Sequence, residues 1–315
     1  MNLHVDDYGG SGAPVLFLHG WGMHGGMWGG ALAELAKQTR VLAVDLPGHG
    51  FSVKLAQRRT VPLALWERGD GGEGAGMASF IIRGGHISMP VSAASGKWQA
   101  ANGNPALTHP SPLTTHYLDA LVDQLATQFS GPEPLTVCGW SLGGQLALRW
   151  AMRYPQQVQR LVLVSATPCF VRQADWPCAM AAATLAAFSE ALQQHYLQTL
   201  RRFLSLQLRG SEQERELLAA LRGNLLSRGE PDLSALQAGL AILRDCDLRA
   251  TLPDIRQPTL VIAGVRDTLT PLPAAQFLAA SMPNARLAAI EGAAHAPFLS
   301  HPETFVKLLA DFLHE

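Results

Sequence analysis

The chain has 315 residues, 48% of them hydrophobic, and a formal net charge of −1 at pH 7. A chain of this length and composition can bury a large core, as one large domain or two ordinary ones, so we expect a globular protein of enzyme size. The near-zero charge excludes a general attraction to nucleic acid or to an anionic membrane.

Export and membrane insertion are not expected from the sequence. The first residues contain neither the basic nor the apolar region of a signal peptide, and no apolar run approaches the roughly 18 residues of a membrane span. The cysteines lack the spacing of a metal site, and Cys138 falls in an expected buried strand. We therefore expect a cytoplasmic monomer that binds neither nucleic acid nor membrane and uses no metal or cofactor.

The N-terminal part alternates strands with a helix. Residues 2–8 can form an edge strand, because apolar and polar side chains alternate there. Residues 14–18 and 40–45 contain the continuous apolar runs of strands that are covered on both faces, and a helical stretch at about 28–37 separates them. Strand, helix and strand in this order predict a parallel α/β sheet.

The segment 53–112 lacks such patterning. It follows a loop at 45–52 that is rich in glycine and proline, and residues 69–76 alone contain five glycines. A stretch of this length without elements of its own is usually a functional lid or a disordered insertion. Because its few large apolar residues are scattered, we expect a disordered insertion that the chemistry does not need.

Regular patterning returns after residue 112. Helical spacing alone fills 168–248, and a helical excursion of this length between two strands is typical of a cap domain. We expect the core of the fold to comprise 1–52, 113–167 and 249–315. Its remaining elements are a helix at 117–125, a strand at 135–138, a helix at 144–150, strands at 160–165, 259–263 and 286–290, and a helix at 302–313.

The most specific motif is Gly139-Trp140-Ser141-Leu142-Gly143, which lies between an expected strand and an expected helix. This is the Gly-x-Ser-x-Gly pattern in the context that a nucleophilic serine requires. The turn is so tight that the serine must adopt strained dihedrals, and side chains at 139 and 143 would collide with neighbours. A Gly/Ser turn that merely fits the pattern is the alternative, and the strand–turn–helix context favours the nucleophile.

A serine nucleophile needs a base and an acid that orients the base. Asp267 follows the strand at 259–263 and His295 follows the strand at 286–290, so both side chains should lie at the sheet edge that presents Ser141. Asp267 could instead cap the next helix. Weaker candidates are Asp245, Asp247 and Asp254, which precede the strand, His301, which looks like a helix-start residue, and His4, His24, His86 and His109, which we expect to be solvated.

Two backbone N–H groups should stabilise the oxyanion of the reaction. Leu142, directly after the serine, supplies one. The loop His19-Gly20-Trp21-Gly22 is the candidate for the other, through the N–H of Trp21, because the flanking glycines allow a close approach of substrate. Trp21 could also be an ordinary core aromatic.

Together these residues resemble the α/β-hydrolase family and, within it, the pimeloyl-[acyl-carrier protein] methyl ester esterases of biotin synthesis. The resemblance covers about 13–52 and 113–315, and 53–112 is an additional segment with respect to that family. The motifs that carry it are Leu18-His19-Gly20-Trp21-Gly22 with Trp28, the segment 44–50, Gly139-Trp140-Ser141-Leu142-Gly143-Gly144, the segment 166–170 with Asp175-Trp176-Pro177, the segment 202–207, and the segment 295–302.

The resemblance implies an α/β-hydrolase fold with a helical cap and a serine esterase with the triad Ser141, Asp267 and His295. It implies hydrolysis of the methyl ester of a pimeloyl chain on acyl carrier protein, without metal or cofactor. It also implies that Trp21, Leu142 and Phe203 line the acyl site.

The cap carries a local basic excess that could attract an acidic carrier protein. Residues 201–228 contain six arginines and only three glutamates. We expect Arg201, Arg202, Arg209 and Arg215 to contact the carrier protein, although a solvated helical surface with intrahelical ion pairs would show the same composition.

Other functions on this fold are compatible with the same residues. A general short-chain carboxylesterase, a carbon–carbon bond hydrolase or a perhydrolase would keep the same triad. Dehalogenases and epoxide hydrolases need a carboxylate nucleophile, so Ser141 argues against them. A non-catalytic binding module would not need an intact triad.

Overall fold

The computed structural model describes residues 2–52, 112–211 and 214–315. By its contacts the chain divides into two units, Met1–Ala56 with His109–Glu315, and Gln57–Thr108. The second unit lies outside the described residues, and so does the prediction that 53–112 is a disordered insertion.

The described residues form one seven-stranded sheet in the order β1-β3-β2-β4-β5-β6-β7. Only the edge strand β1 is antiparallel to its neighbour, and the other pairs are parallel. The predicted parallel α/β sheet is therefore confirmed. The strands are β1 (Val5–Gly9), β2 (Val15–Leu18), β3 (Val41–Val44), β4 (Leu135–Trp140), β5 (Val158–Val164), β6 (Thr259–Gly264) and β7 (Ala285–Ile290).

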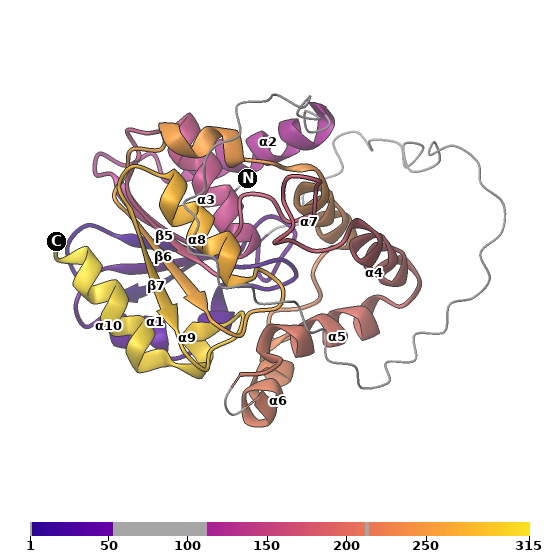
Figure 1. Cartoon of the computed structure of the whole chain (residues 1–315). Coiled ribbons are helices and arrows are strands. Elements are labelled where there is room, and N and C mark those ends of the chain that lie inside the picture. Colours follow the sequence, from indigo (N-terminus) through magenta and orange to yellow (C-terminus); the bar gives the residue numbers. More distant parts are fainter. Residues whose placement is uncertain (1, 53–111, 212–213) are drawn as a thin grey trace. The chain divides into compact units, whose positions relative to one another are not determined.

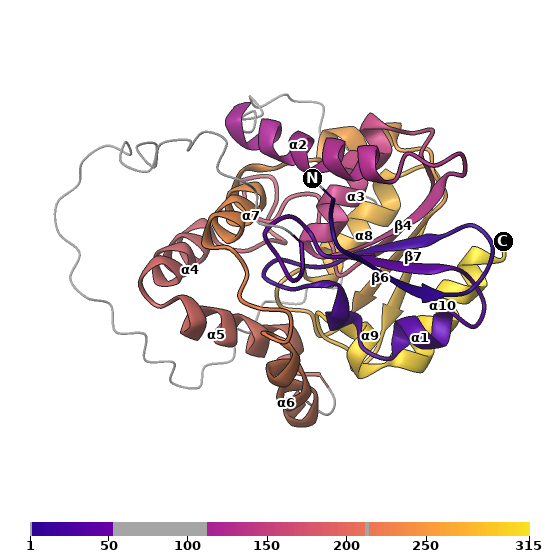
Figure 2. The ribbon, with the colours of Figure 1, turned by 180° about the vertical axis from the view of Figure 1, so that it is seen from behind.

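Both faces of the central strands are covered. Every residue of β2, β4 and β6 is buried, including Cys138, because helices pack on each side of the sheet. Helices α1 and α10 lie on one side, and α2, α3 and α8 lie on the other (Figures 1 and 2). These helices are α1 (Ala31–Leu35), α2 (Pro112–Gln128), α3 (Leu142–Arg153), α8 (Leu272–Ser281) and α10 (Pro302–Leu313), and the shorter elements are η1 (Gly25–Trp28), η3 (Arg249–Asp254) and α9 (Pro297–Ser300).

Helices α4 to α7, which we call the cap helices, form a group at one end of the sheet (Figures 1 and 2). They are α4 (Ala182–Gln194), α5 (Tyr196–Leu208), α6 (Glu214–Asn224) and α7 (Leu233–Asp245). The expectation of helices throughout 168–248 is wrong for its first part, because residues 168–181 contain prolines that interrupt a helix. They form isolated β-bridges instead, which pair Cys169 with Asp247, Val171 with Met180, and Gln173 with Trp176.

A largely buried ion pair joins Arg228, in the segment after α6, to Asp6 within β1 and to Asp45, which directly follows β3. Nη1 of Arg228 lies 2.6 Å from a carboxylate oxygen of Asp6 and 3.2 Å from one of Asp45. The Asp45 side chain is completely buried and also accepts the backbone N–H groups of Gly25 and Phe51, at 2.6 and 2.7 Å. Removing one partner would therefore leave an unpaired charge in the interior.

We expect Arg228→Met to lower the free energy of unfolding by about 3–5 kcal/mol, because the carboxylate of Asp45 stays buried without its cation. Adding Asp45→Asn should recover part of the loss, since it removes that charge. Urea unfolding measures all variants.

The control is Arg286→Met. Arg286 pairs with Glu315 where both side chains are about half exposed, so its loss should cost less than about 1 kcal/mol. An equally small loss for Arg228→Met would contradict the importance of the buried pair.

Candidate active site

Ser141 occupies the sharp turn between β4 and α3. Its φ of 56° lies in the region that residues other than glycine rarely adopt. A Cβ atom at Gly139 would lie 2.3 Å from the carbonyl oxygen of Gly143, and one at Gly143 would lie 2.3 Å from that of Leu18. The two glycines are therefore required by crowding, and the turn holds the serine at the N-terminus of α3.

Asp267 and His295 meet in the interior although 27 residues separate them along the chain. Nδ1 of His295 lies 2.8 Å from Oδ2 of Asp267, and both side chains are at most 1% exposed. The carboxylate also accepts the backbone N–H groups of Leu269 and Thr270 and the hydroxyl of Thr270, at 2.7–3.0 Å. These bonds fix the carboxylate, which in turn orients the imidazole.

The hydrogen bonds of His295 determine its tautomer. Because the carboxylate of Asp267 can only accept, Nδ1 carries the proton and Nε2 is left as an acceptor. Nε2 is buried and has no hydrogen-bond partner among the described residues. A buried acceptor without a partner is what a general base needs to receive a proton.

The backbone of His295 is held on both sides, a feature that the sequence analysis missed. Its N–H donates to the carbonyl of Gln207 in cap helix α5 at 3.0 Å, and its carbonyl accepts the indole N–H of Trp140 at 2.9 Å. The only signal in the sequence was the tryptophan beside the serine.

The loop at 19–22 lies beside the serine, since a Cβ atom at Gly20 would be 3.4 Å from Cβ of Ser141. His19 orients this loop. Its Nε2 accepts the N–H of Leu46 at 3.0 Å, so Nδ1 carries the proton and donates to the carbonyl of Gly20 at 2.8 Å. This bond fixes the peptide that also contains the N–H of Trp21.

Three aromatic rings, those of Trp21, Phe188 and Phe203, pack together at this loop, and we call them the aromatic wall. Trp21 packs edge-to-face on Phe203 of α5 and on Phe188 of α4, with ring centroids 5.0 and 5.4 Å apart, and its indole N–H donates to the carbonyl of Leu236 in α7 at 2.8 Å. The structure thus brings Trp21 and Phe203 together, as expected, and adds Phe188, which the sequence analysis did not single out.

The chain matches the family model described as alpha/beta hydrolase fold over residues 13–302. It belongs to the α/β-hydrolase family. This match confirms the predicted fold and family.

Curated relatives identify the kind of hydrolase. The chain is 38% identical to a pimeloyl-[acyl-carrier protein] methyl ester esterase of Nitrosomonas europaea, with 97% of each chain covered. It is 37% identical to the protein of the same name from Chromobacterium violaceum, with 99% of this chain and 98% of that protein covered. The chain is thus an esterase of the α/β-hydrolase family.

Solved structures support the fold of this esterase. An esterase from Exiguobacterium antarcticum superposes with a TM-score of 0.73 at 22% identity, covering 99% of this chain and 96% of that chain. A bromoperoxidase from Bacillus anthracis superposes with a TM-score of 0.72 at 20% identity, covering 99% and 95%. At these identities the likeness shows the fold alone.

The cap arginines of the esterase lie on its surface. Arg201, Arg202, Arg209 and Arg215 are exposed, and none of them forms an ion pair with another described residue. Glu214, one of the acids nearby, instead accepts the backbone N–H of Gly210 at 2.9 Å. Intrahelical ion pairs therefore do not account for the basic excess within the part of α5 and α6 that the structure describes.

The weaker candidates have structural roles. Asp245 accepts the hydroxyl of Thr114, Asp247 pairs with Arg249, and His301 stands at the N-cap of α10. The expectation that His24 is solvated is wrong, since it is 3% exposed. It is buried because its ring accepts the N–H of Gly26 and also bonds to the carbonyl of Asn224, at 3.1 and 2.9 Å.

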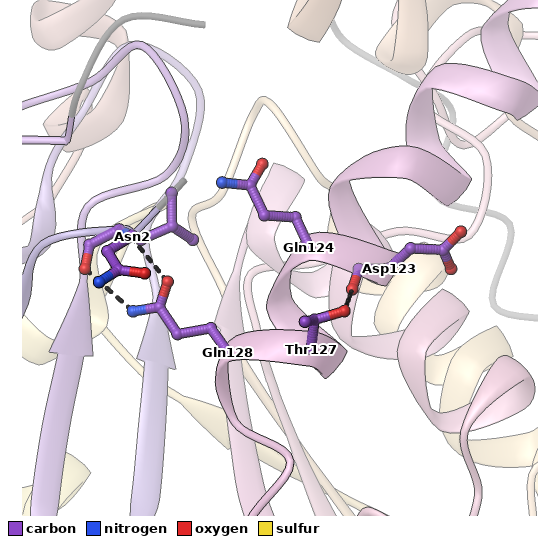
Figure 3. Close-up of a pocket in the computed structure, with 6 residues that line it drawn as sticks. Asn2, Asp123, Gln124, Thr127 and Gln128 are labelled. Carbon is purple, nitrogen blue, oxygen red and sulfur yellow. Dashed lines mark hydrogen bonds between the residues drawn. The ribbon is translucent and has the colours of Figure 1, made fainter.

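A hollow of about 750 Å³ lies between the N-terminus and α2, away from these residues (Figure 3). Several of its polar groups are engaged: Gln128 binds both the N–H and the carbonyl of Leu3, and the carboxylate of Asp123 accepts from Arg153 and from the hydroxyl of Tyr154. Its one carboxylate among the described residues, that of Asp123, is paired with Arg153, and no histidine, serine or cysteine of these residues lines it. The residues that line it are Asn2, Leu3, Asp123, Gln124, Thr127 and Gln128.

Metal-ligand clusters and membrane-spanning helices are both absent from the described residues. Within them, no group of three His, Cys, Asp or Glu side chains is arranged to hold a metal ion. None of the helices in the described ranges is long and apolar enough to cross a membrane.

His19 in the loop at 19–22 and two other buried histidines, His24 and His49, should make the esterase sensitive to acid. Burial lowers the pKa of His19 well below its usual value and also lowers the pKa values of His24 and His49. Near pH 6.5 the unfolded chain then binds protons that the folded chain does not bind. The free energy of unfolding therefore keeps its full value above this pH and decreases as the pH falls below it.

Each such histidine can increase the slope of the unfolding free energy against pH by at most about 1.4 kcal/mol per pH unit. Urea unfolding between pH 7.5 and 5.5 should show this slope, and His24→Asn, which keeps an acceptor for Gly26, should reduce it by up to one proton. An unchanged slope in the variant would contradict the assignment.

Proposed function

We propose that this esterase hydrolyses the methyl ester of pimeloyl-[acyl-carrier protein] and frees the pimeloyl carboxylate, through the triad Ser141, His295 and Asp267. The observation that carries the triad is the buried bond between His295 and Asp267, which leaves Nε2 of His295 as a free acceptor. The names of the relatives support the substrate.

The reaction proceeds through an acyl-enzyme. The hydroxyl of Ser141 attacks the ester carbonyl carbon while its proton passes to Nε2 of His295. His295 returns this proton to the methoxy oxygen as the carbon–oxygen bond breaks and methanol leaves. A water molecule, deprotonated by His295, then attacks the acyl group, and Ser141 recovers its proton as the acid is released.

The oxyanion of each tetrahedral intermediate accepts hydrogen bonds from the backbone N–H groups of Trp21 and Leu142. The N–H of Leu142 is available because it begins α3 and the first N–H groups of a helix have no partner within the helix. The bond from His19 to the carbonyl of Gly20 supports the role of Trp21, since it holds the same peptide in one orientation.

The cap, residues 168–248, contributes Phe203 to the acyl site and supplies the carrier contact. Trp21, Leu142 and Phe203 line the acyl site, where the aromatic wall offers apolar surface to the methylene chain. The exposed arginines Arg201, Arg202, Arg209 and Arg215 attract the acidic carrier protein by screened electrostatic attraction.

Removing the nucleophile or the base should abolish turnover. We expect Ser141→Ala and His295→Ala each to lower kcat by on the order of 10⁴ or more, because members of a triad act as a unit. Release of methanol from carrier-bound pimeloyl methyl ester measures the loss. Near-normal hydrolysis by either folded variant would overturn the triad.

The same assay with a panel of free methyl esters separates the proposed function from that of a general short-chain carboxylesterase. The proposal requires that carrier-bound pimeloyl methyl ester has the highest kcat/KM of the panel. A carbon–carbon bond hydrolase or a perhydrolase would release no methanol at a comparable rate.

Reversing charge on α5 should weaken carrier recognition alone. We expect Arg201→Glu with Arg202→Glu to raise KM for the carrier-bound ester about tenfold at low salt and to spare a small free ester. Arg256→Glu is the control, because Arg256 is exposed but lies outside the cap helices. Equal effects on both substrates, or an equal effect of the control, would contradict the carrier contact.

A further inference from the structure

Gly239 lies inside cap helix α7, where glycine weakens a helix and therefore calls for a packing reason. A Cβ atom at this position would lie 2.7 Å from Cδ1 of Trp21, 3.2 Å from its Nε1 and 3.3 Å from Cδ2 of Leu142. Glycine thus lets α7 approach the two residues whose N–H groups form the proposed oxyanion hole.

The ring of Trp21 has little freedom to avoid a methyl group at 239. It is 1% exposed and is bound to α7 through the hydrogen bond from Nε1 to the carbonyl of Leu236. Its other contacts are the rings of Phe203 and Phe188, on α5 and α4. A methyl group at 239 would therefore push the indole away from α7 and against the rings of Phe203 and Phe188.

We propose that Gly239 is a specificity-determining residue, because its missing side chain lets Trp21 recede against α7 and makes room for a medium-length acyl chain. The inference rests on the proposed function only in placing the acyl chain against Trp21. It concerns chain length and requires neither the carrier protein nor the pimeloyl group.

The test compares the p-nitrophenyl esters of acetate and hexanoate. Gly239→Ala should keep kcat/KM for acetate within about threefold and lower it for hexanoate by about tenfold or more, a change of the size that one methylene-sized misfit produces. The matched control is Gly223→Ala in α6, where an added Cβ atom meets nothing within 4 Å, so the ratio of the two esters should stay at the wild-type value.

A second substitution tests the direction of the effect. In Gly239→Ala, the further change Trp21→Phe replaces the indole by a smaller ring, keeps the backbone N–H and should restore part of the hexanoate activity. Trp21→Phe alone should raise the ratio of hexanoate to acetate, which keeps the proposal testable if Gly239→Ala does not fold.

Results that contradict the role of Gly239 differ from the result that contradicts the proposed substrate. An unchanged ratio in folded Gly239→Ala, an equal loss on both esters, or an unchanged ratio in Trp21→Phe would overturn the role of Gly239. Failure of the wild-type protein to release methanol from carrier-bound pimeloyl methyl ester would overturn the proposed substrate, and the shift in chain-length preference would remain.

Discussion

The strained turn at Ser141 is the constraint on which the rest of the site depends. A positive φ at a serine is held only because β4 and α3 are both packed against the sheet and because the adjacent glycines relieve the crowding. The turn fixes where a nucleophile can stand. The loop after β2 lies directly beside this turn, since a Cβ atom at Gly20 would be 3.4 Å from Cβ of Ser141, and the parallel strands β6 and β7 carry Asp267 and His295 in their following loops at the same edge of the sheet.

The cap helices contribute to this geometry as well as covering it. Helix α5 binds the backbone N–H of His295 through Gln207, and α7 binds the indole of Trp21 through Leu236. Arg228, after α6, is paired with the buried Asp45 of the core. Since cap residues bond directly to groups next to the catalytic candidates, the position of the cap and the geometry of the site are linked.

The sheet, the turn at Ser141 and the pairing of Asp267 with His295 follow from local patterns, because continuous apolar runs mark strands and parallel strands place their following loops at one edge. The contacts of Gln207 and Phe188 do not follow in this way, since they depend on how the cap helices lie on the core. The bond from Trp140 to the carbonyl of His295 does not follow either, because it joins residues that are 155 positions apart along the chain. The burial of His24 was missed for the same reason: its partner Asn224 is 200 residues away along the chain.

We propose that Ser141 forms an acyl-enzyme with His295 as its base. Rapid acid quenching of the protein during turnover of p-nitrophenyl acetate, followed by mass spectrometry of its peptides, tests this claim directly. We expect an acetyl group on Ser141 in the wild-type protein and little acetyl group there at the same quench time in His295→Ala. Acetylation of a different residue, or equally fast acetylation of Ser141 without His295, would contradict it.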